Sequence, residues 1–205
     1  MKNKKKKHYM ELVERTLVII PVLNEEKSLI RSIDDLKKYF NNILVIDDKS
    51  DIPVEKLNLP SDVKILSHYF NTGQGGALQT GFDYLKNHTK KYDYLITFDG
   101  DGQHSSIDAY NMLIYAYKSK FDLVVGSRFL NKNSSKNVPF RKRLYLSIAV
   151  KFENILTGLD HTDSQNGLRV VSSKLIKCIN LKNSRMAHST ELIKIATLQK
   201  ATIKE

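Results

Sequence analysis

Residues 16–21 read TLVIIP, and this run decides the fold class of the chain. A continuous apolar run without polar alternation predicts a strand that is buried on both faces and stopped by its proline, as in a parallel sheet. A helix is predicted next, because Leu29, Ile33 and Leu36 recur at helical spacing and form one apolar stripe. The run ILVI at residues 43–46 then predicts a second strand. Strand, helix and strand in this order imply a right-handed crossover between parallel strands.

The same alternation continues to about residue 125. Three more strands and two more helices are predicted, the strands at residues 63–66, 94–98 and 123–125 and the helices at residues 77–85 and 107–117. This order is typical of an α/β fold with an open, mostly parallel sheet and helices on both faces.

The last part of the chain has a different character. Residues 139–159 predict a helix with a basic start, residues 167–171 a short strand and residues 191–199 a last helix. No internal repeat or linker divides the chain. We therefore expect one domain, residues 16–205, after a basic N-terminal tail, residues 1–15.

The composition of the 205 residues is that of a globular protein, with 41% hydrophobic and 27% charged residues, which excludes a disordered, collagenous or low-complexity chain. The 33 Lys and Arg residues outnumber the 22 Asp and Glu residues and give a formal net charge of +11. Such a surplus indicates a polyanionic neighbour: nucleic acid, an anionic membrane surface or phosphate-bearing ligands. The lysine-rich residues 2–7 are equally consistent with a solvated, solubilising tail.

Two further features bear on location. The single cysteine, Cys178, cannot form an internal disulfide, which suits a reducing cytosol, and we expect it to be a small buried residue. No stretch approaches the roughly 20 apolar residues that cross a bilayer, and no apolar signal core follows residues 1–8. The sequence therefore predicts a cytoplasmic chain that neither spans a membrane nor is secreted.

A polar cluster follows each of the five strands predicted up to residue 125. Because ligands of open α/β sheets bind outside the carboxyl ends of the strands, the clusters are expected to converge on one edge. The five clusters are Asn24-Glu25, Asp47-Asp48, Asn71-Thr72-Gly73, Asp99-Gly100-Asp101 and Gly126-Ser127-Arg128.

The aspartates of the fourth cluster suggest a metal site. Asp99 and Asp101 leave a buried strand with one glycine between them, so their carboxylates can hold a hard divalent cation that binds diphosphate oxygens. Short Asp-x-Asp motifs are common by chance, but this position at a strand end favours function.

The second and third clusters have two interpretations each. Asp47-Asp48 either caps a turn or accepts hydrogen bonds from a nucleobase and ribose, and its place in the sheet favours the second. Gly73, Gly75 and Gly76 either bring backbone N–H groups near an anion or allow a tight turn and close helix packing. They match neither the P-loop nor the dinucleotide-binding pattern.

In order and spacing these motifs resemble glycosyltransferase family 2, and most closely its polyprenyl-phosphate branch, the dolichyl-phosphate mannose synthase-like enzymes. The resemblance covers residues 16–205. It departs from the family at Lys49, where glycine is usual, and at Gln74, where lysine is frequent. The blocks that carry it are Pro21-Val22-Leu23-Asn24-Glu25-Glu26, Val45-Ile46-Asp47-Asp48-Lys49-Ser50, Asn71-Thr72-Gly73 with Gly76-Ala77 and Gly81, Asp99-Gly100-Asp101-Gly102-Gln103-His104, and Gly126-Ser127-Arg128.

The resemblance implies a GT-A fold, which is Rossmann-like, a nucleotide-sugar donor, Mg²⁺ or Mn²⁺, and inversion at the anomeric carbon. Residues 16–128 would bind the donor and residues 129–205 the acceptor. The implied donor-binding residues are Pro21, Asn24, Glu25, Asp47, Asp48, Asn71, Asp99 and Gln103. The implied metal ligands are Asp99, Asp101 and Gln103. The implied catalytic residues are Asp101, Arg128, Asp163, Arg169 and Glu191.

The residue types suit the implied chemistry. Cleavage of a sugar–diphosphate bond leaves additional negative charge, which a metal at Asp101 and the guanidinium groups of Arg128 and Arg169 would stabilise. A lipid phosphate acceptor is already anionic near neutral pH and needs no general base. A sugar hydroxyl acceptor must lose a proton, for which Asp163 and Glu191 are the candidate bases.

The predicted helix at residues 139–159 is amphipathic, with Arg141, Lys142 and Arg143 before an apolar stripe. It either lies at a membrane surface and presents Arg141 and Arg143 to a lipid phosphate, or packs on the sheet as an ordinary helix. The resemblance favours the membrane.

These features predict a metal-dependent inverting glycosyltransferase that transfers a hexose from a UDP- or GDP-sugar to polyprenyl phosphate at the cytoplasmic membrane face. The expected partners are the donor, the acceptor, an anionic membrane surface and a separate membrane protein. One alternative is transfer to a sugar hydroxyl in cell-surface polysaccharide assembly. Another is a non-catalytic basic protein that binds nucleic acid or membranes, but no nucleic-acid-binding motif supports a nucleic-acid partner.

Overall fold

The computed structural model describes residues 2–89, 91–127, 162–163, 165–185 and 187–205. Within them one seven-stranded sheet has the order β3-β2-β1-β4-β6-β5-β7. Its strands are β1 (Thr16–Val22), β2 (Ile43–Asp47), β3 (Lys64–Ser67), β4 (Tyr94–Thr97), β5 (Leu123–Val125), β6 (Arg169–Ser172) and β7 (Ile203–Lys204).

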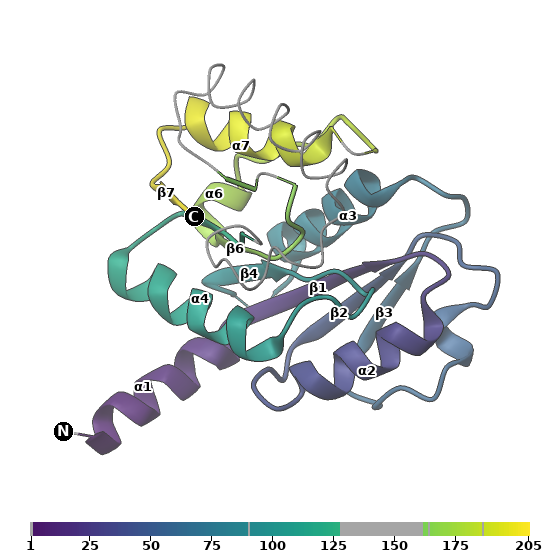
Figure 1. Cartoon of the computed structure of the whole chain (residues 1–205), viewed down its shortest axis with the longest axis horizontal. Coiled ribbons are helices and arrows are strands. Elements are labelled where there is room, and N and C mark those ends of the chain that lie inside the picture. Colours follow the sequence, from purple (N-terminus) through teal and green to yellow (C-terminus); the bar gives the residue numbers. More distant parts are fainter. Residues whose placement is uncertain (1, 90, 128–161, 164, 186) are drawn as a thin grey trace.

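Helices cover both faces of the sheet (Figure 1). Helices α2 (Glu26–Leu36) and α4 (Ser106–Ser119) pack on one face, and α3 (Gln74–Asn87), α6 (Ser173–Ile176) and α7 (His188–Leu198) on the other. A 3₁₀ turn, η1 (Val54–Lys56), precedes β3. The predicted apolar stripe of α2 is confirmed, because Leu29, Ile33 and Leu36 are fully buried. Burial of this stripe beneath β1 supplies much of the core on that face.

The predicted α/β fold with a mostly parallel sheet is confirmed. Strand β1 pairs in parallel with β2 and β4, and β2 pairs in parallel with β3. The strand predicted at residues 167–171 forms β6, which runs antiparallel between β4 and β5. Its residues are buried along its whole length, so it fills the centre of that half of the sheet.

Strand β1 continues through Pro21, where the sequence predicts its end. The N–H of Val18 bonds to Asn42 beside β2, so by alternation the nitrogen of Pro21 faces β4. The pairing of β1 with β4 reaches only Ile19. Pro21 therefore removes no ladder hydrogen bond and is tolerated in the strand.

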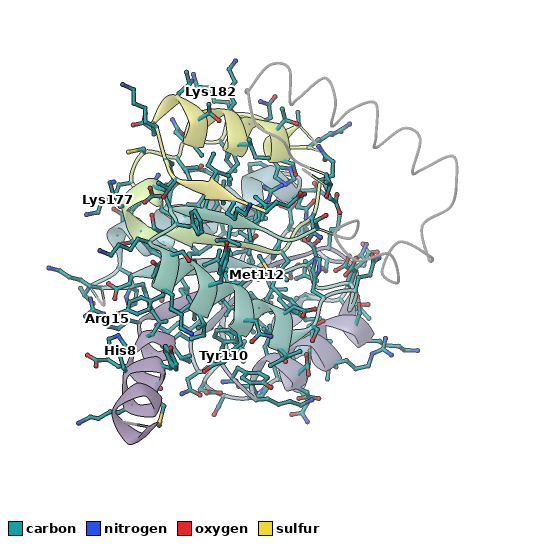
Figure 2. All side chains as sticks on the ribbon, turned by 60° about the vertical axis from the view of Figure 1, so that its left-hand side comes forward. His8, Arg15, Tyr110, Met112, Lys177 and Lys182 are labelled. Atoms are coloured by element: carbon teal, nitrogen blue, oxygen red, sulfur yellow. The ribbon has the colours of Figure 1, made fainter. Side chains whose placement is uncertain are left out.

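Residues 2–14 form a helix, α1 (Lys2–Glu14), where the sequence predicts a tail. The helix is tied to the domain near its end, because Leu12 and Val13 are buried in the core below α4. His8 hydrogen-bonds to the hydroxyl of Tyr117 on α4, and Figure 2 shows His8 on α1 beside that helix. Because lysines dominate the composition of this segment, the sequence provided little indication that Leu12 and Val13 anchor it to the core.

Two other expectations bear on location. Cys178 is exposed, which corrects the prediction that it is buried; it follows the short helix α6 at the surface. In the described parts of the chain, no helix combines the length and the apolar character needed to cross a membrane. The helix predicted at residues 139–159, with Arg141 and Arg143, lies outside the described residues.

Candidate active site

A cavity of about 360 Å³ opens at the carboxyl edge of the sheet. The ends of β1, β2 and β4 and the start of α3 form its walls. Its lining residues are Pro21, Val22, Leu23, Glu25, Asp48, Gly73, Gln74, Ala77, Asp99, Gly100 and Asp101. Four of the five predicted polar clusters therefore contribute to one pocket, because parallel strands bring their carboxyl ends to the same edge.

Asp48 lines the pocket, and its carboxylate also holds the loop between β3 and α3 through hydrogen bonds. It is 3% exposed, and its Oδ1 accepts hydrogen bonds from the N–H of Thr72 at 2.8 Å and the hydroxyl of Thr72 at 2.7 Å. Its Oδ2 accepts the N–H of Gly73 at 2.7 Å. Since a carboxylate only accepts, His68 Nδ1 donates to Oδ1 at 2.8 Å, while His68 Nε2 lies 2.9 Å from Thr80 Oγ1. Asp48 thus holds both ends of the loop.

Asp47 lies outside the pocket lining. It is 2% exposed, and its carboxylate accepts the N–H groups of Ser50 at 2.8 Å and Val54 at 3.1 Å. The side chain stabilises the loop that leaves β2, which corresponds to the turn-capping interpretation.

Asn24 and Asn71 also contact neighbouring backbone rather than line the cavity. Asn24 has a φ of 57° and its Oδ1 accepts the N–H of Asp51 at 2.7 Å. The Oδ1 of Asn71 accepts the N–H of Gly73 at 2.9 Å. Both side chains brace loops around the pocket.

Three acidic side chains, Glu25, Asp99 and Asp101, line the pocket. Asp99 Oδ1 accepts the amide of Gln74 at 3.0 Å, and His104 Nε2 donates to Asp99 Oδ2 at 3.1 Å. Asp101 is exposed, and its Oδ1 accepts the N–H of Gln103 at 2.9 Å. Burial, with the negative charges of Asp101 and Asp99, raises the pKa of Glu25 to about 7.

The donor set suits a divalent cation that is shared with a ligand. No group of three or more His, Cys, Asp or Glu side chains is arranged as a metal site among the described residues. Asp99 and Asp101 offer two carboxylates, and Glu25 lies beside them. Diphosphate oxygens and water would complete the oxygen shell that Mg²⁺ prefers. Gln103 is exposed, and in the described contacts it meets Asp101 through a hydrogen bond from its backbone N–H.

The glycines at the start of α3 allow close contact with the loop before α7. A side chain at Gly73 would come within 2.3 Å of Ser184 O, and one at Gly75 within 2.1 Å of Asn183 O. The N–H of Gly75 donates to Ser184 O at 2.8 Å. The close-packing interpretation therefore describes these two glycines, although their neighbour is residues 182–184 and not the sheet.

Glu191 controls that same loop. Its carboxylate accepts the N–H of Lys182 at 3.0 Å and of Asn183 at 2.9 Å. Although burial acts in the opposite direction, these hydrogen bonds lower the pKa of Glu191. The predicted catalytic residue is thus attached to the backbone that packs on α3, away from the pocket lining.

The other predicted catalytic residues are buried or lie elsewhere. Asp163 is fully buried, and Arg169 is 1% exposed within β6, opposite Thr97 of β4. Gly167, between them in the sequence, lies against Asp99 of the pocket lining, because a side chain there would overlap the carboxylate of Asp99. Arg128 lies outside the described residues, as do Arg141 and Arg143.

The structure assigns roles to side chains for which the sequence predicted no individual role. Gln74 and His104 orient Asp99, and His68 and Thr72 orient Asp48. His188 is buried near Arg169, and burial lowers its pKa with a further contribution from the Arg169 charge. Gln74 and His104 stood inside or beside the quoted motifs, but nothing local showed which carboxylate they would meet.

The sheet order and the acidic pocket at its carboxyl edge are those of a GT-A fold, the α/β fold of nucleotide-sugar transferases. The solved structure of glucosyl-3-phosphoglycerate synthase from Mycobacterium tuberculosis shares this fold, with a TM-score of 0.66 over 96% of this chain and 73% of that one. The sequences are 16% identical, so this similarity concerns the fold alone.

Sequence comparison defines the family. The family described as glycosyl transferase family 2 matches residues 17–179. The chain is 35% identical to an uncharacterised protein of Methanocaldococcus jannaschii, over 94% of this chain and 79% of that protein. It is 31% identical to the UDP-N-acetylglucosamine–dolichyl-phosphate N-acetylglucosaminyltransferase of Methanococcus voltae, over 92% of this chain and 82% of the relative. Further relatives are named polyprenol monophosphomannose synthase and dolichol-phosphate mannosyltransferase.

The chain therefore belongs to glycosyl transferase family 2, and it is a glycosyltransferase. The predicted resemblance to the polyprenyl-phosphate branch is confirmed by the relatives that carry such names.

Proposed function

We propose that this glycosyltransferase moves a hexose from a UDP- or GDP-sugar to polyprenyl phosphate at the cytoplasmic membrane face, with Mg²⁺ or Mn²⁺ and with inversion. The observation that carries the proposal is the group of Glu25, Asp99 and Asp101 in one pocket at the carboxyl edge of the sheet. Two relatives have names that refer to dolichyl phosphate or to polyprenol monophosphomannose, and these names support this acceptor class.

In this proposal some pocket residues form the walls of the donor site, and others orient or supply its negative charge. Asp48 holds the loop that forms one wall, and Pro21 and Leu23 provide an apolar wall for the nucleoside. Gln74 and His104 hold the carboxylate of Asp99 in one orientation, so it need not reorganise when charge develops. A divalent cation bound by Asp99 and Asp101 would neutralise the leaving diphosphate.

The placement of the two candidate bases supports a phosphate acceptor. Glu191 is bonded to the backbone of Lys182 and Asn183, and Asp163 is fully buried. Neither lines the pocket, so neither is placed to take a proton from a sugar hydroxyl there. A lipid phosphate is already a nucleophile near neutral pH and requires no base. Arg141 and Arg143 remain our predicted contacts for that phosphate, beside a membrane surface and a separate membrane protein partner.

The donor site is tested by thermal unfolding with UDP, GDP, UDP-sugars and GDP-mannose, each with and without Mn²⁺. A ligand that binds only the folded state raises its stability, so one nucleotide should raise the unfolding midpoint only when the metal is present. Asp101→Ala should abolish this shift and leave the midpoint without ligand within about 2 °C of wild type, because an exposed carboxylate contributes little to stability. Asp34→Ala, an exposed aspartate on α2, is the matched control and should retain the shift.

The outcomes separate the parts of the proposal. An unchanged shift in Asp101→Ala would remove the metal role from that residue. Absence of a shift with every nucleotide would contradict the donor site. Transfer to a sugar hydroxyl but not to polyprenyl phosphate, measured with radiolabelled donor, would favour polysaccharide assembly instead.

A further inference from the structure

Four exposed apolar side chains gather at the edge of the sheet that holds the pocket. Tyr69 is 95% exposed and Phe70 71% exposed, both in the loop after β3. Leu23 follows β1 with 40% exposure, and Ile52 follows β2 with 52%. Since β3, β2 and β1 are adjacent strands, the four residues lie on three neighbouring loops. We refer to Leu23, Ile52, Tyr69 and Phe70 as the apolar rim.

The two aromatic residues are held in place by the loop that carries them. Asp48 bonds to His68 on one side of the pair and to Thr72 and Gly73 on the other. His68 is fastened further to Thr80 of α3. The loop is therefore anchored at both ends while its tip presents Tyr69 and Phe70 to solvent. Adjacent large aromatic side chains that are kept exposed in this way mark an interaction surface.

The rim borders the pocket mouth. Leu23 itself lines the cavity, as do Asp48 and Gly73, which anchor the aromatic loop. The loop with Ile52 joins the β1 end through the hydrogen bond from Asp51 N–H to Asn24. Whatever covers the rim is therefore brought to the opening of the donor pocket.

We propose that the apolar rim enters the interfacial region of a lipid bilayer and so brings the pocket to the phosphate of the lipid acceptor. This inference rests on the proposed function, because a polyprenyl chain stays in the bilayer and its phosphate lies at the surface. Tyr and Phe side chains suit that depth, and a tyrosine keeps its hydroxyl in the wet head-group layer.

The lysine-rich helix does not share this surface. Helix α1 leads into the first residue of β1 and so lies at the amino edge, while the rim lies at the carboxyl edge (Figure 1). Membrane contact through the rim is therefore mainly apolar and should persist with uncharged lipids and at high salt, where contact through lysines is screened.

Flotation with phosphatidylcholine vesicles in high salt tests the rim directly. Wild type should float with the vesicles, and the double variant Tyr69→Ser/Phe70→Ser should bind at least about tenfold more weakly, because it loses two large apolar side chains from the interface. The matched control is Tyr115→Ser/Leu198→Ser, which removes two exposed apolar side chains of α4 and α7, and it should bind as wild type does. Failure of wild type to float, or equal loss in both double variants, would overturn the proposal.

Two further measurements separate this proposal from the proposed function. The rim variant should retain the metal-dependent nucleotide shift; if it loses the shift, Tyr69 and Phe70 belong to the donor site and the membrane role is wrong. Transfer to polyprenyl phosphate in vesicles should fall about tenfold, in line with vesicle binding, while transfer to a short-chain, water-soluble prenyl phosphate should not change. If wild type transfers to neither acceptor, the proposed function fails, and the flotation result still decides whether the rim binds bilayers.

Discussion

The ends of β2 and β4 carry similar acidic pairs with opposite surroundings. Asp47 and Asp48 are buried, and their carboxylates accept hydrogen bonds from backbone N–H groups in two segments, at Ser50 and Val54 after β2 and at Thr72 and Gly73 after β3. Asp99 is half-buried and Asp101 is exposed in the pocket, and the two accept only one backbone N–H between them among the described contacts. The first pair therefore holds structure, and the second retains acceptor capacity for a ligand.

The comparison shows that backbone donors decide the role of a carboxylate. A strand end followed by two aspartates looks the same in the sequence whether the N–H groups of the next loop fold back over it or not. Where they do, removal of the carboxylate leaves buried donors unpaired and costs stability. Where they do not, we expect removal of the carboxylate to weaken ligand binding instead.

The largest effect on stability is expected for Asp48→Ala. Loss of the carboxylate removes the acceptor of the Thr72 N–H, one of two acceptors of the Gly73 N–H and the partner of His68 in a part-buried loop, so the free energy of unfolding should fall by about 3 kcal/mol. Urea denaturation monitored by circular dichroism measures this change. Asp101→Ala, the exposed counterpart, should change it by less than about 0.5 kcal/mol. Equal losses in the two variants would erase the distinction between the pairs.

A smaller effect is expected for Glu191→Ala, which releases the loop at residues 182–184 from its anchor. The loss of two partly exposed backbone hydrogen bonds should lower the free energy of unfolding by about 1 kcal/mol at pH 7. Because the pKa of Glu191 is lowered in the folded state, its contribution is present above the ordinary pKa of 4.5 and is lost as the pH falls below that value. The difference from wild type should therefore shrink in acid.

Stability curves at several pH values measure the Glu191 effect, with the exposed Glu11 of α1 replaced by alanine as the control. A variant that unfolds as wild type does but has lost transfer altogether would restore the catalytic role that the sequence predicts for Glu191.

The smallest effect is expected for Gln74→Ala at the open pair. The amide of Gln74 orients Asp99 from an exposed position, so its loss should leave stability nearly unchanged and weaken metal-dependent nucleotide binding about threefold. Isothermal titration calorimetry with the nucleotide chosen by the thermal panel provides the affinity. Unchanged affinity would mean that His104 alone suffices to orient Asp99.

Much of the fold was predictable because its signals are local. The runs at residues 16–21 and 43–46 and the stripe of α2 depend only on neighbours along the chain. The antiparallel place of β6 was not predictable, since a short apolar run specifies burial but not which strands it joins. The packing of α1 was not predictable either, because Leu12 and Val13, which fix its end, are only two apolar residues in a lysine-rich segment.

The candidate site divides in the same way. The position of Asp99 and Asp101 after a strand was enough to place them at the carboxyl edge. The contact of Gly75 with Asn183 joins segments more than 100 residues apart, and the anchoring of Glu191 to residues 182–183 matters to the site only through that contact. Such contacts have no signal in any window of the sequence.

The sequence by itself determined the α/β class, the family and the edge of the sheet at which chemistry-bearing residues gather, because hydrophobic periodicity and motif order are properties of the linear chain. The tertiary structure alone decided which of these residues hold loops and which face the pocket. That decision depends on how the loops after β2 and β3 fold: their backbone N–H groups cover the carboxylates of Asp47 and Asp48, whereas Asp99 and Asp101 keep free acceptor capacity in the pocket.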